Sequence, residues 1–326
     1  MPTETSPAPR PPDSGPSAAG GVIHDLDYRR YDGPRLGRSR IVAALAWHSL
    51  RSAFGLGRGP KAKIVPVFAF IAICLPAAVN AFVMSRGNPR LVDYDTYVPV
   101  LRDLIMTVFV AVQAPELVSR DLRSRVLPLY FSRPIEPGDY PLAKYLGFTA
   151  ACLVMLEVPL LLLYGGTVAN VHGGAAVWAQ TRALIPGLLV GLLWAVALAA
   201  ISLLLASLTG RRAFATGAVA IAFLLTYTLA EILLQGETQA AAQAGPGGPA
   251  PRASGSAAVC LAEKVSGLFS PFTLLDGVRM WLGGTNPADN VPKPGAFGAV
   301  YALVLIALVG LCLVGLAARY RKARLS

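Results

Sequence analysis

Charged side chains and histidines are both scarce in this chain of 326 residues. Only 14% of the residues are charged, whereas 54% are hydrophobic, and the mean hydropathy is +0.54. A soluble domain does not need that much apolar surface to fill its core, so the excess indicates contact with lipid. The composition therefore excludes an ordinary soluble protein and predicts a membrane protein with several spans.

The sequence also has little of what catalysis or metal binding needs. All three histidines lie outside the long apolar segments, three of the four cysteines lie inside them, and there is no HExxH or GxSxG motif. The glycine-rich GLGRGPK at 55–61 lacks the spacing of a phosphate-binding loop, and no Ser or Thr follows its lysine. We therefore expect no catalytic residue, no metal site and no bound cofactor, and we expect any ATP to be bound by another chain.

Basic residues exceed acidic ones, and their positions explain the excess without nucleic acid. The formal net charge is +11, yet the 29 lysines and arginines cluster beside apolar segments, as membrane topology requires. Six segments are each long enough to cross roughly 30 Å of hydrocarbon as a helix. They are residues 64–84, 98–118, 142–164, 183–208, 214–234 and 296–318. With both termini in the cytoplasm, 21 of the 29 basic residues fall on that side of the cell membrane.

The segments outside the spans predict three further features. Residues 1–37 form a disordered cytoplasmic tail rich in Pro, Ser and Ala, and residues 321–326 form a short basic one. Residues 40–54 have apolar side chains on one helical side, including Trp47, and polar ones on the other, including Ser49. This predicts a helix on the inner membrane surface or packed on the protein. In the outer loop 235–295, residues 259–282 form two short apolar stretches broken at Ser270 and Pro271, which predicts a re-entrant hairpin or two interfacial helices.

Four carboxylates fall within the predicted spans, and three of them lie near a membrane edge. For Asp103, Glu116 and Glu231 we expect paired or snorkelling structural roles, with Arg120 one turn from Glu116. Glu157 lies deep in the third span and is followed by Pro159. It is a candidate to line a polar pathway or to hold a contact between helices.

The loop after the second span contains the most specific motif of the sequence. It reads APELVSRDLRSRVLPLYFSRPIEPGDYPLAKYLGF over residues 114–148. The motif begins with an acidic and basic stretch, which is followed by a short apolar helix. A small residue, a basic residue and a proline come next, and an aromatic residue and a lysine follow later. The residues at these positions are Asp121, Leu127, Leu129, Ser132, Arg133, Pro134, Tyr140 and Lys144.

This pattern resembles the first cytoplasmic loop of ABC transporter permeases of the type-2 export class. Arg125 and Val126 stand where the commonest form of that loop has Gly-Thr. The resemblance covers residues 38–320 and implies an all-α polytopic membrane protein. Its fold would have six transmembrane helices, an N-terminal interfacial helix and a re-entrant helical hairpin in the last outer loop.

The resemblance also implies a function and partners. The chain would be the membrane-spanning permease subunit of an ATP-driven transporter, with export expected. Two separate ABC ATP-binding subunits would hydrolyse the ATP, a second permease copy, identical or related, would complete the pathway, and the chain itself would not be an enzyme. A coupling helix would dock on the ATPase, and the residues implied in this contact are Asp121, Arg123, Val126, Leu127, Leu129, Phe131 and Arg133.

Three other functions compete with this interpretation. A secondary transporter that needs no ATPase is the main alternative, although no clear internal repeat or set of paired buried charges supports it. An intramembrane enzyme lacks a nucleophile with a base. A scaffold that recruits an ATPase without transporting anything is the remaining possibility. The sequence does not name the cargo.

Overall fold

The computed structural model describes most of the chain after residue 36. The described residues are 33, 37–88, 91, 99–123, 136, 138–243, 265, 267–282 and 295–325, without the side chains of 99–103, 120, 122–123, 231, 233–243, 296 and 323–325. All the helices belong to one unit, Gly37–Ser326. The predicted tail 1–37 therefore lies almost wholly outside the described residues.

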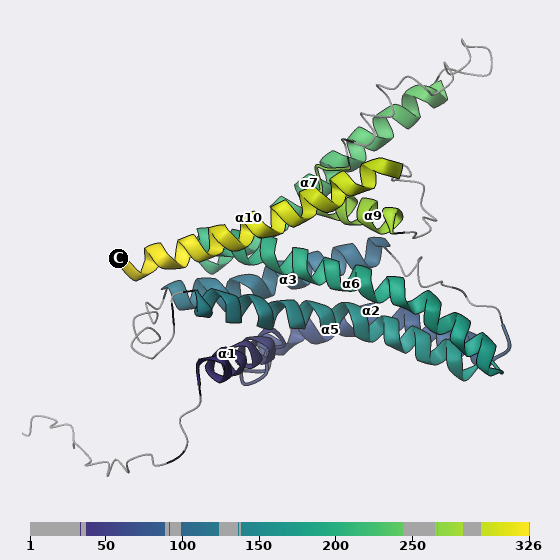
Figure 1. Cartoon of the computed structure of the whole chain (residues 1–326), viewed down its shortest axis with the longest axis horizontal. Helices are drawn as coiled ribbons and strands as arrows, with labels where there is room; N and C mark the ends of the chain where they lie inside the picture. Colours follow the sequence, from purple (N-terminus) through teal and green to yellow (C-terminus); the bar gives the residue numbers. More distant parts are fainter. Residues whose placement is uncertain are drawn as a thin grey trace, which may run out of the picture. The chain divides into compact units, whose positions relative to one another are not determined.

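All regular structure in the described residues is helical (Figure 1). The α-helices are α1 (Arg38–Ala53), α2 (Lys61–Ser85), α3 (Pro99–Arg123), α5 (Asp139–Ala169), α6 (Gly174–Leu208), α7 (Arg212–Gln243), α9 (Pro271–Trp281) and α10 (Gly298–Leu325), with a 3₁₀ turn η1 (Gly295–Phe297) before the last. The expected all-α class is confirmed for this part of the chain.

Five of these helices contain segments long and apolar enough to cross a membrane. The segments are Lys61–Ser85, Asp139–Ala169, Gly174–Leu208, Arg212–Ala230 and Gly298–Lys322, and the mean hydropathy of their most apolar windows is 1.8 to 2.8. They coincide with five of the six predicted spans. The chain is therefore a multi-pass membrane protein.

The second predicted span, 98–118, falls on α3, whose described side chains include the apolar segment Leu104–Ser119, shorter than the five above. This helix packs against α1, α2, α5, α6 and α7. Its apolar Met106 and Phe109 are buried, and so are its polar Thr107 and Gln113. Because protein rather than lipid surrounds these side chains, polar residues are tolerated and the hydropathy of α3 is low. Six spans remain a prediction.

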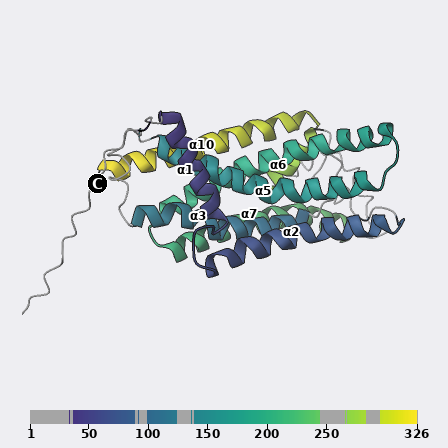
Figure 2. The same cartoon turned by 90° about the horizontal axis from the view of Figure 1, so that it is seen from below.

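The long helices alternate in direction, and α1 marks one end of the bundle (Figures 1 and 2). At this end, which we call the α1 end, α2, α5 and α7 begin, and α3, α6 and α10 finish. Figure 2 shows α1 crossing the long helices instead of running along them. The end of α3 and the start of α5, which flank the predicted coupling loop in the sequence, are both at the α1 end.

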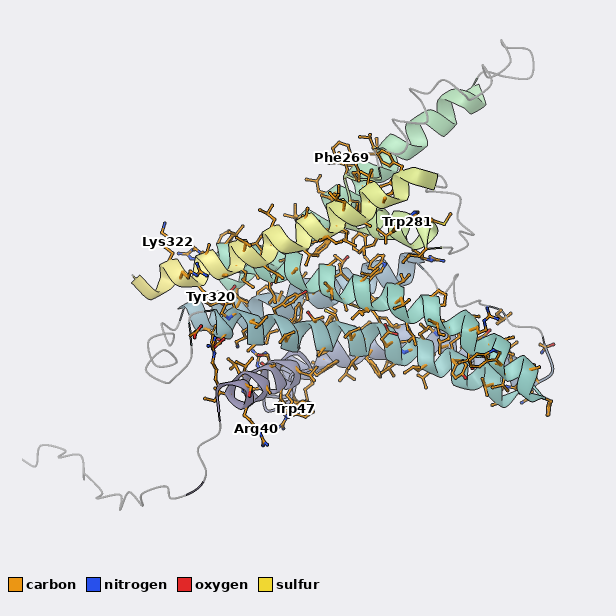
Figure 3. All side chains as sticks on the ribbon, viewed as in Figure 1. Arg40, Trp47, Phe269, Trp281, Tyr320 and Lys322 are labelled. Atoms are coloured by element: carbon orange, nitrogen blue, oxygen red, sulfur yellow. The ribbon has the colours of Figure 1, made fainter. Side chains whose placement is uncertain are left out.

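The α1 helix is packed on the bundle through one side and is exposed on the other. Gly147 of α5 lets the helices approach closely, because a Cβ there would lie 2.4 Å from the carbonyl oxygen of Ala46 and 2.6 Å from Cβ of Ser49. Ser49 was expected on the polar side but is buried in this contact. Trp47 is 61% exposed, and its side chain and that of Arg40 point away from the bundle (Figure 3).

The α9 helix is the described part of the predicted hairpin, and it enters the bundle from the opposite end. Ser270 caps it by accepting a hydrogen bond from the Phe272 backbone N–H at 3.2 Å, and Pro271 occupies its first turn. Phe272 contacts Trp194 and Phe223, with ring centroids 5.3 Å and 5.6 Å away. Phe223 is 11 residues into α7, roughly 16 Å from the start of that helix. The N-terminus of α9 therefore reaches well inside the bundle.

Candidate functional site

The predicted coupling residues fall on both sides of the described boundary. Asp121 and Arg123 are in the last turn of α3, although only the side chain of Asp121 is described. The remaining predicted contacts lie outside the described residues: Val126, Leu127, Leu129, Phe131 and Arg133. The site can therefore be built from the helix ends that flank this loop.

Asp121 connects the two helices on either side of the loop. Its Oδ2 lies 2.8 Å from Nζ of Lys144 on α5 and also accepts a hydrogen bond from the hydroxyl of Tyr140. The Lys144 side chain is only 7% exposed, and its Nζ lies 5.4 Å from the centroid of the Tyr140 ring. Tyr140 in turn packs against Tyr320 of α10, with ring centroids 5.3 Å apart. Three helices are thus joined through one carboxylate and its neighbours.

Glu116 forms a second group of ion pairs, five residues earlier on α3. Its carboxylate pairs with Arg58, in the turn between α1 and α2, and with Arg212 at the start of α7. The Glu116 side chain is 6% exposed, and that of Arg58 is 19% exposed. The expected neighbour Arg120 has no described side chain, so two other arginines are the partners that the structure identifies. Each is far from Glu116 in sequence.

Arg38 connects α1 to the other end of the loop. Its Nε and Nη2 donate to the two carboxylate oxygens of Asp139 at 2.7 Å and 2.8 Å, and Nη1 donates to Glu136. These hydrogen bonds, first to Asp139 and then to Glu136, raise the pKa of the Arg38 guanidinium above its usual value. The arginine therefore stays charged and bidentate at any physiological pH.

Side chains from two neighbouring helices donate hydrogen bonds to backbone carbonyl groups at the C-terminal end of α6. Ser119 of α3 donates to the carbonyl oxygen of Ala206 at 3.0 Å, and Arg319 of α10 donates to that of Ser207 at 3.3 Å. The last carbonyl groups of a helix have no partner within the helix, so these contacts satisfy groups that would otherwise need water.

These contacts form what we call the ionic belt. Its members are Arg38, Arg58, Glu116, Ser119, Asp121, Glu136, Asp139, Tyr140, Lys144, Arg212, Arg319 and Tyr320. The belt lies at the α1 end and includes the helix ends on both sides of the predicted coupling loop.

Glu157 is in a different environment, in the middle of α5. A Cβ on Gly191 of α6 would lie 2.2 Å from Oε1 of Glu157, so the carboxyl group occupies the space that the glycine leaves. Both carboxyl oxygens are buried, and no described residue forms a hydrogen bond with either. The predicted pathway candidate is therefore enclosed between two helices, and it does not line an open cavity in this conformation.

Sequence reasoning identified only part of the belt. Tyr140 and Lys144 were noticed as motif positions, and Glu116 as a paired carboxylate, but Arg58 and Arg212 were interpreted only as cytoplasmic basic residues. Lys144 stands in the predominantly apolar first part of α5, and a lysine in such a segment indicates that it has a buried acidic partner. Nothing in the linear sequence indicated which carboxylate each cation would meet.

No group of three or more metal-binding side chains occurs among the residues that the structure describes. No protein-family model matches the chain, and no curated protein matches it. The functional argument therefore depends on the residues themselves.

Proposed function

We propose that the chain is the permease subunit of an ATP-driven ABC transporter of the type-2 export class. The observation that carries the proposal is the ionic belt around the loop 124–135. Asp121 of the loop motif is bonded to Tyr140 and Lys144, which are two further positions of the same motif. The residues that suggested the family in sequence thus also form one contact in space.

The belt supports a mechanism of rigid-body coupling. Ion pairs that are partly or wholly buried hold a fixed geometry more firmly than exposed pairs do. In the proposed transporter, a separate ATP-binding subunit docks on residues 126–133. When ATP binding closes the two ATP-binding subunits on each other, the docked subunit pushes the loop. The push reaches α3 and α5 directly, α7 through Glu116 and Arg212, and α10 through Tyr140 and Tyr320.

Topology supports the same proposal. The Arg58–Glu116 and Lys144–Asp121 pairs bring the starts of α2 and α5 close to the end of α3, which supports a membrane crossing by α3 in the direction opposite to α2 and α5. We therefore propose six spans, with the α1 end and both termini on the cytoplasmic side of the cell membrane.

Two peripheral elements would then have membrane roles. The exposed Trp47 and Arg40 of α1 suit the inner interface, where aromatic and basic side chains are enriched. The α9 helix is 11 residues long, too short to cross, and its deep N-terminus suits the second arm of a re-entrant hairpin in the outer half of the membrane. A second permease copy would complete the pathway.

The docking part of the proposal is tested in the loop itself. An uncompensated charge in a small docking groove costs a few kcal/mol, so Leu129→Asp or Arg133→Glu should lower affinity for the ATP-binding subunit about a hundredfold. Both variants should insert at normal levels and lose ATP-dependent transport. Membrane insertion, co-purification of the ATPase and transport would be measured together.

Arg324→Glu provides the control for these variants, because it changes the same kind of charge in the C-terminal tail. It should retain both ATPase binding and transport. If both loop variants also bind the ATPase and transport normally, the coupling proposal is wrong.

A secondary transporter is the second candidate, and Glu157 is the observation that favours it. Carboxyl groups inside the membrane often serve proton or ion coupling in such proteins. Transport that continues without any ATPase and stops when a proton gradient is dissipated would establish this alternative.

A further inference from the structure

The carboxyl group of Glu157 is the ionisable group that the proposed coupling mechanism does not use. It lies between α5 and α6, helices that pack against each other along their lengths. Gly191 provides the space for it, and the neighbouring contact at Gly187 is with the apolar Leu160. The surroundings identified on α6 thus offer the carboxyl room but no hydrogen bond.

The environment of Glu157 determines whether its carboxyl group carries a proton. An ionised carboxylate that is neither solvated nor paired costs many kcal/mol in an apolar medium, and such groups become neutral instead. A neutral carboxyl still lacks its hydrogen bonds, but the cost is far smaller. The buried, enclosed arrangement therefore suits the acid form, and solvent contact would be needed to stabilise the anion.

Among the described side chains, no ionisable residue on the helices that face Glu157 supplies a counter-charge at its level. On α6 the one ionisable residue is Arg182, nine residues and roughly 13 Å along the axis from Gly191. On α2, Cys74 is nearest in depth, because Ala81 of α2 meets Gly166 of α5. Cys152 and Tyr164 lie more than one turn away on α5 itself, and these groups are ordinarily neutral.

The described charged side chains on the other helices that touch α5 lie toward the ends of those helices. The α1 helix meets α5 at Gly147, ten residues before Glu157. Phe109 of α3 packs against Phe148, so Glu116 and Asp121 lie toward the α1 end, whereas Arg102 and Asp103 are outside the described side chains. On α10, Cys312 is within the span and Arg319 is bound to α6.

We infer that Glu157 and Gly191 form a proton-binding site within the membrane, where the carboxyl holds a proton while α5 and α6 are packed and releases it when they separate. The step is a simple dissociation: the O–H bond breaks, the electron pair stays on the carboxylate, and the proton goes to water that reaches the site. The inference does not require an ATP-binding partner, so it can succeed or fail independently of the proposed function.

Dicyclohexylcarbodiimide provides a direct probe, because this hydrophobic reagent reacts with protonated carboxyl groups. The acid proton moves to a nitrogen of the reagent while the carboxyl oxygen adds to its central carbon, and transfer of the acyl group to nitrogen gives a stable adduct. The purified full-length permease would be treated at a series of pH values, and modification of Glu157 would be measured by peptide mass spectrometry. A water-soluble carbodiimide would be run in parallel.

We expect the hydrophobic reagent to modify Glu157 and the water-soluble reagent to leave it unmodified. The rate should fall roughly tenfold per pH unit above the titration midpoint, following the protonated fraction. Glu157→Gln should remove the modification at this position. Absence of modification at every pH would overturn the inference, since it would mean that the carboxyl is ionised, for example by pairing with Arg102. Equal modification by both reagents would also overturn it, because the site would then be wet.

A glycine pair tests the enclosed geometry. Gly191→Ala places a Cβ 2.2 Å from Oε1 and must displace the carboxyl, whereas Gly187→Ala, one turn away, meets only the flexible Leu160 side chain at 3.0 Å. Modification by the hydrophobic reagent should slow several-fold in Gly191→Ala and stay unchanged in Gly187→Ala. Equal rates in the two variants would contradict the assigned site even if both proteins fold well.

Discussion

Glu116 and Glu157 are both glutamates on long helices of the bundle, but their surroundings differ. The carboxylate of Glu116 meets two arginines at the α1 end, from the turn before α2 and from the start of α7. The carboxyl of Glu157 meets a glycine and no described donor. The difference teaches that a carboxylate near a helix end can be structural through its ion pairs, whereas an enclosed carboxyl with no described partner is a candidate for function.

The largest expected effect is at Glu116. Glu116→Ala leaves the poorly exposed Arg58 without its counter-charge, so the free energy of unfolding should fall by about 3–5 kcal/mol. Unfolding of the purified protein by a denaturing detergent would measure it. Glu136→Ala is the matched control, because its ion pair with Arg38 is exposed and should be worth about 1 kcal/mol or less. Equal losses would remove the distinction between buried and exposed pairs in the belt.

The second effect concerns the packing of α1 against α5 at the α1 end of the bundle. Gly147→Ala forces a Cβ against the backbone of Ala46, so it should destabilise the protein by about 1–3 kcal/mol through overpacking. Gly165→Ala on the same helix has nothing within 4 Å of the added Cβ and should be neutral or slightly stabilising. The same unfolding measurement applies. If Gly147→Ala matches Gly165→Ala, α1 is not packed on α5 as described.

A smaller effect is expected from the ion pair between Asp121 and Lys144, on the two helices that flank the loop 124–135 in the sequence. In a double-mutant cycle with Asp121→Asn and Lys144→Met, the interaction energy should be about 1–2 kcal/mol, because the two groups are in direct contact and little exposed. Additive effects of the two substitutions would show that the loop ends are not coupled through this pair. The conclusion that Asp121 anchors the loop would then be wrong.

The sequence predicted the fold better than it predicted the site, for physical reasons. Long apolar runs report contact with lipid, so α2, α5, α6, α7 and α10 were identifiable from composition alone. The α3 helix was harder to classify, because a helix surrounded by protein can carry Thr107 and Gln113 without meeting lipid.

Contacts between distant residues were not predictable from local patterns. Ser49 was placed on the polar side of α1 by helical periodicity, yet the absence of a side chain at Gly147 lets α1 approach and bury it. The partners of Glu116 lie 58 residues before it and 96 after it, beyond the reach of any helical periodicity. Glu157 was recognised from its depth, but its enclosure depends on Gly191, which no spacing rule links to it.

The smallest expected effect has the opposite sign and is at Glu157. Glu157→Leu replaces a buried group that has no described partner by an apolar one of similar size, so the free energy of unfolding should stay the same or rise by about 1 kcal/mol. Glu116→Leu, measured beside it, should instead show the large loss expected for a broken ion pair. A loss of 2 kcal/mol or more, as an order of magnitude, in Glu157→Leu would show that the carboxyl has a partner in the folded protein. Glu157 would then belong with the belt as a structural residue. A stable Glu157→Leu variant that has lost transport would place the role of this carboxyl in function, because stability would not explain why an ionisable residue stands at this position.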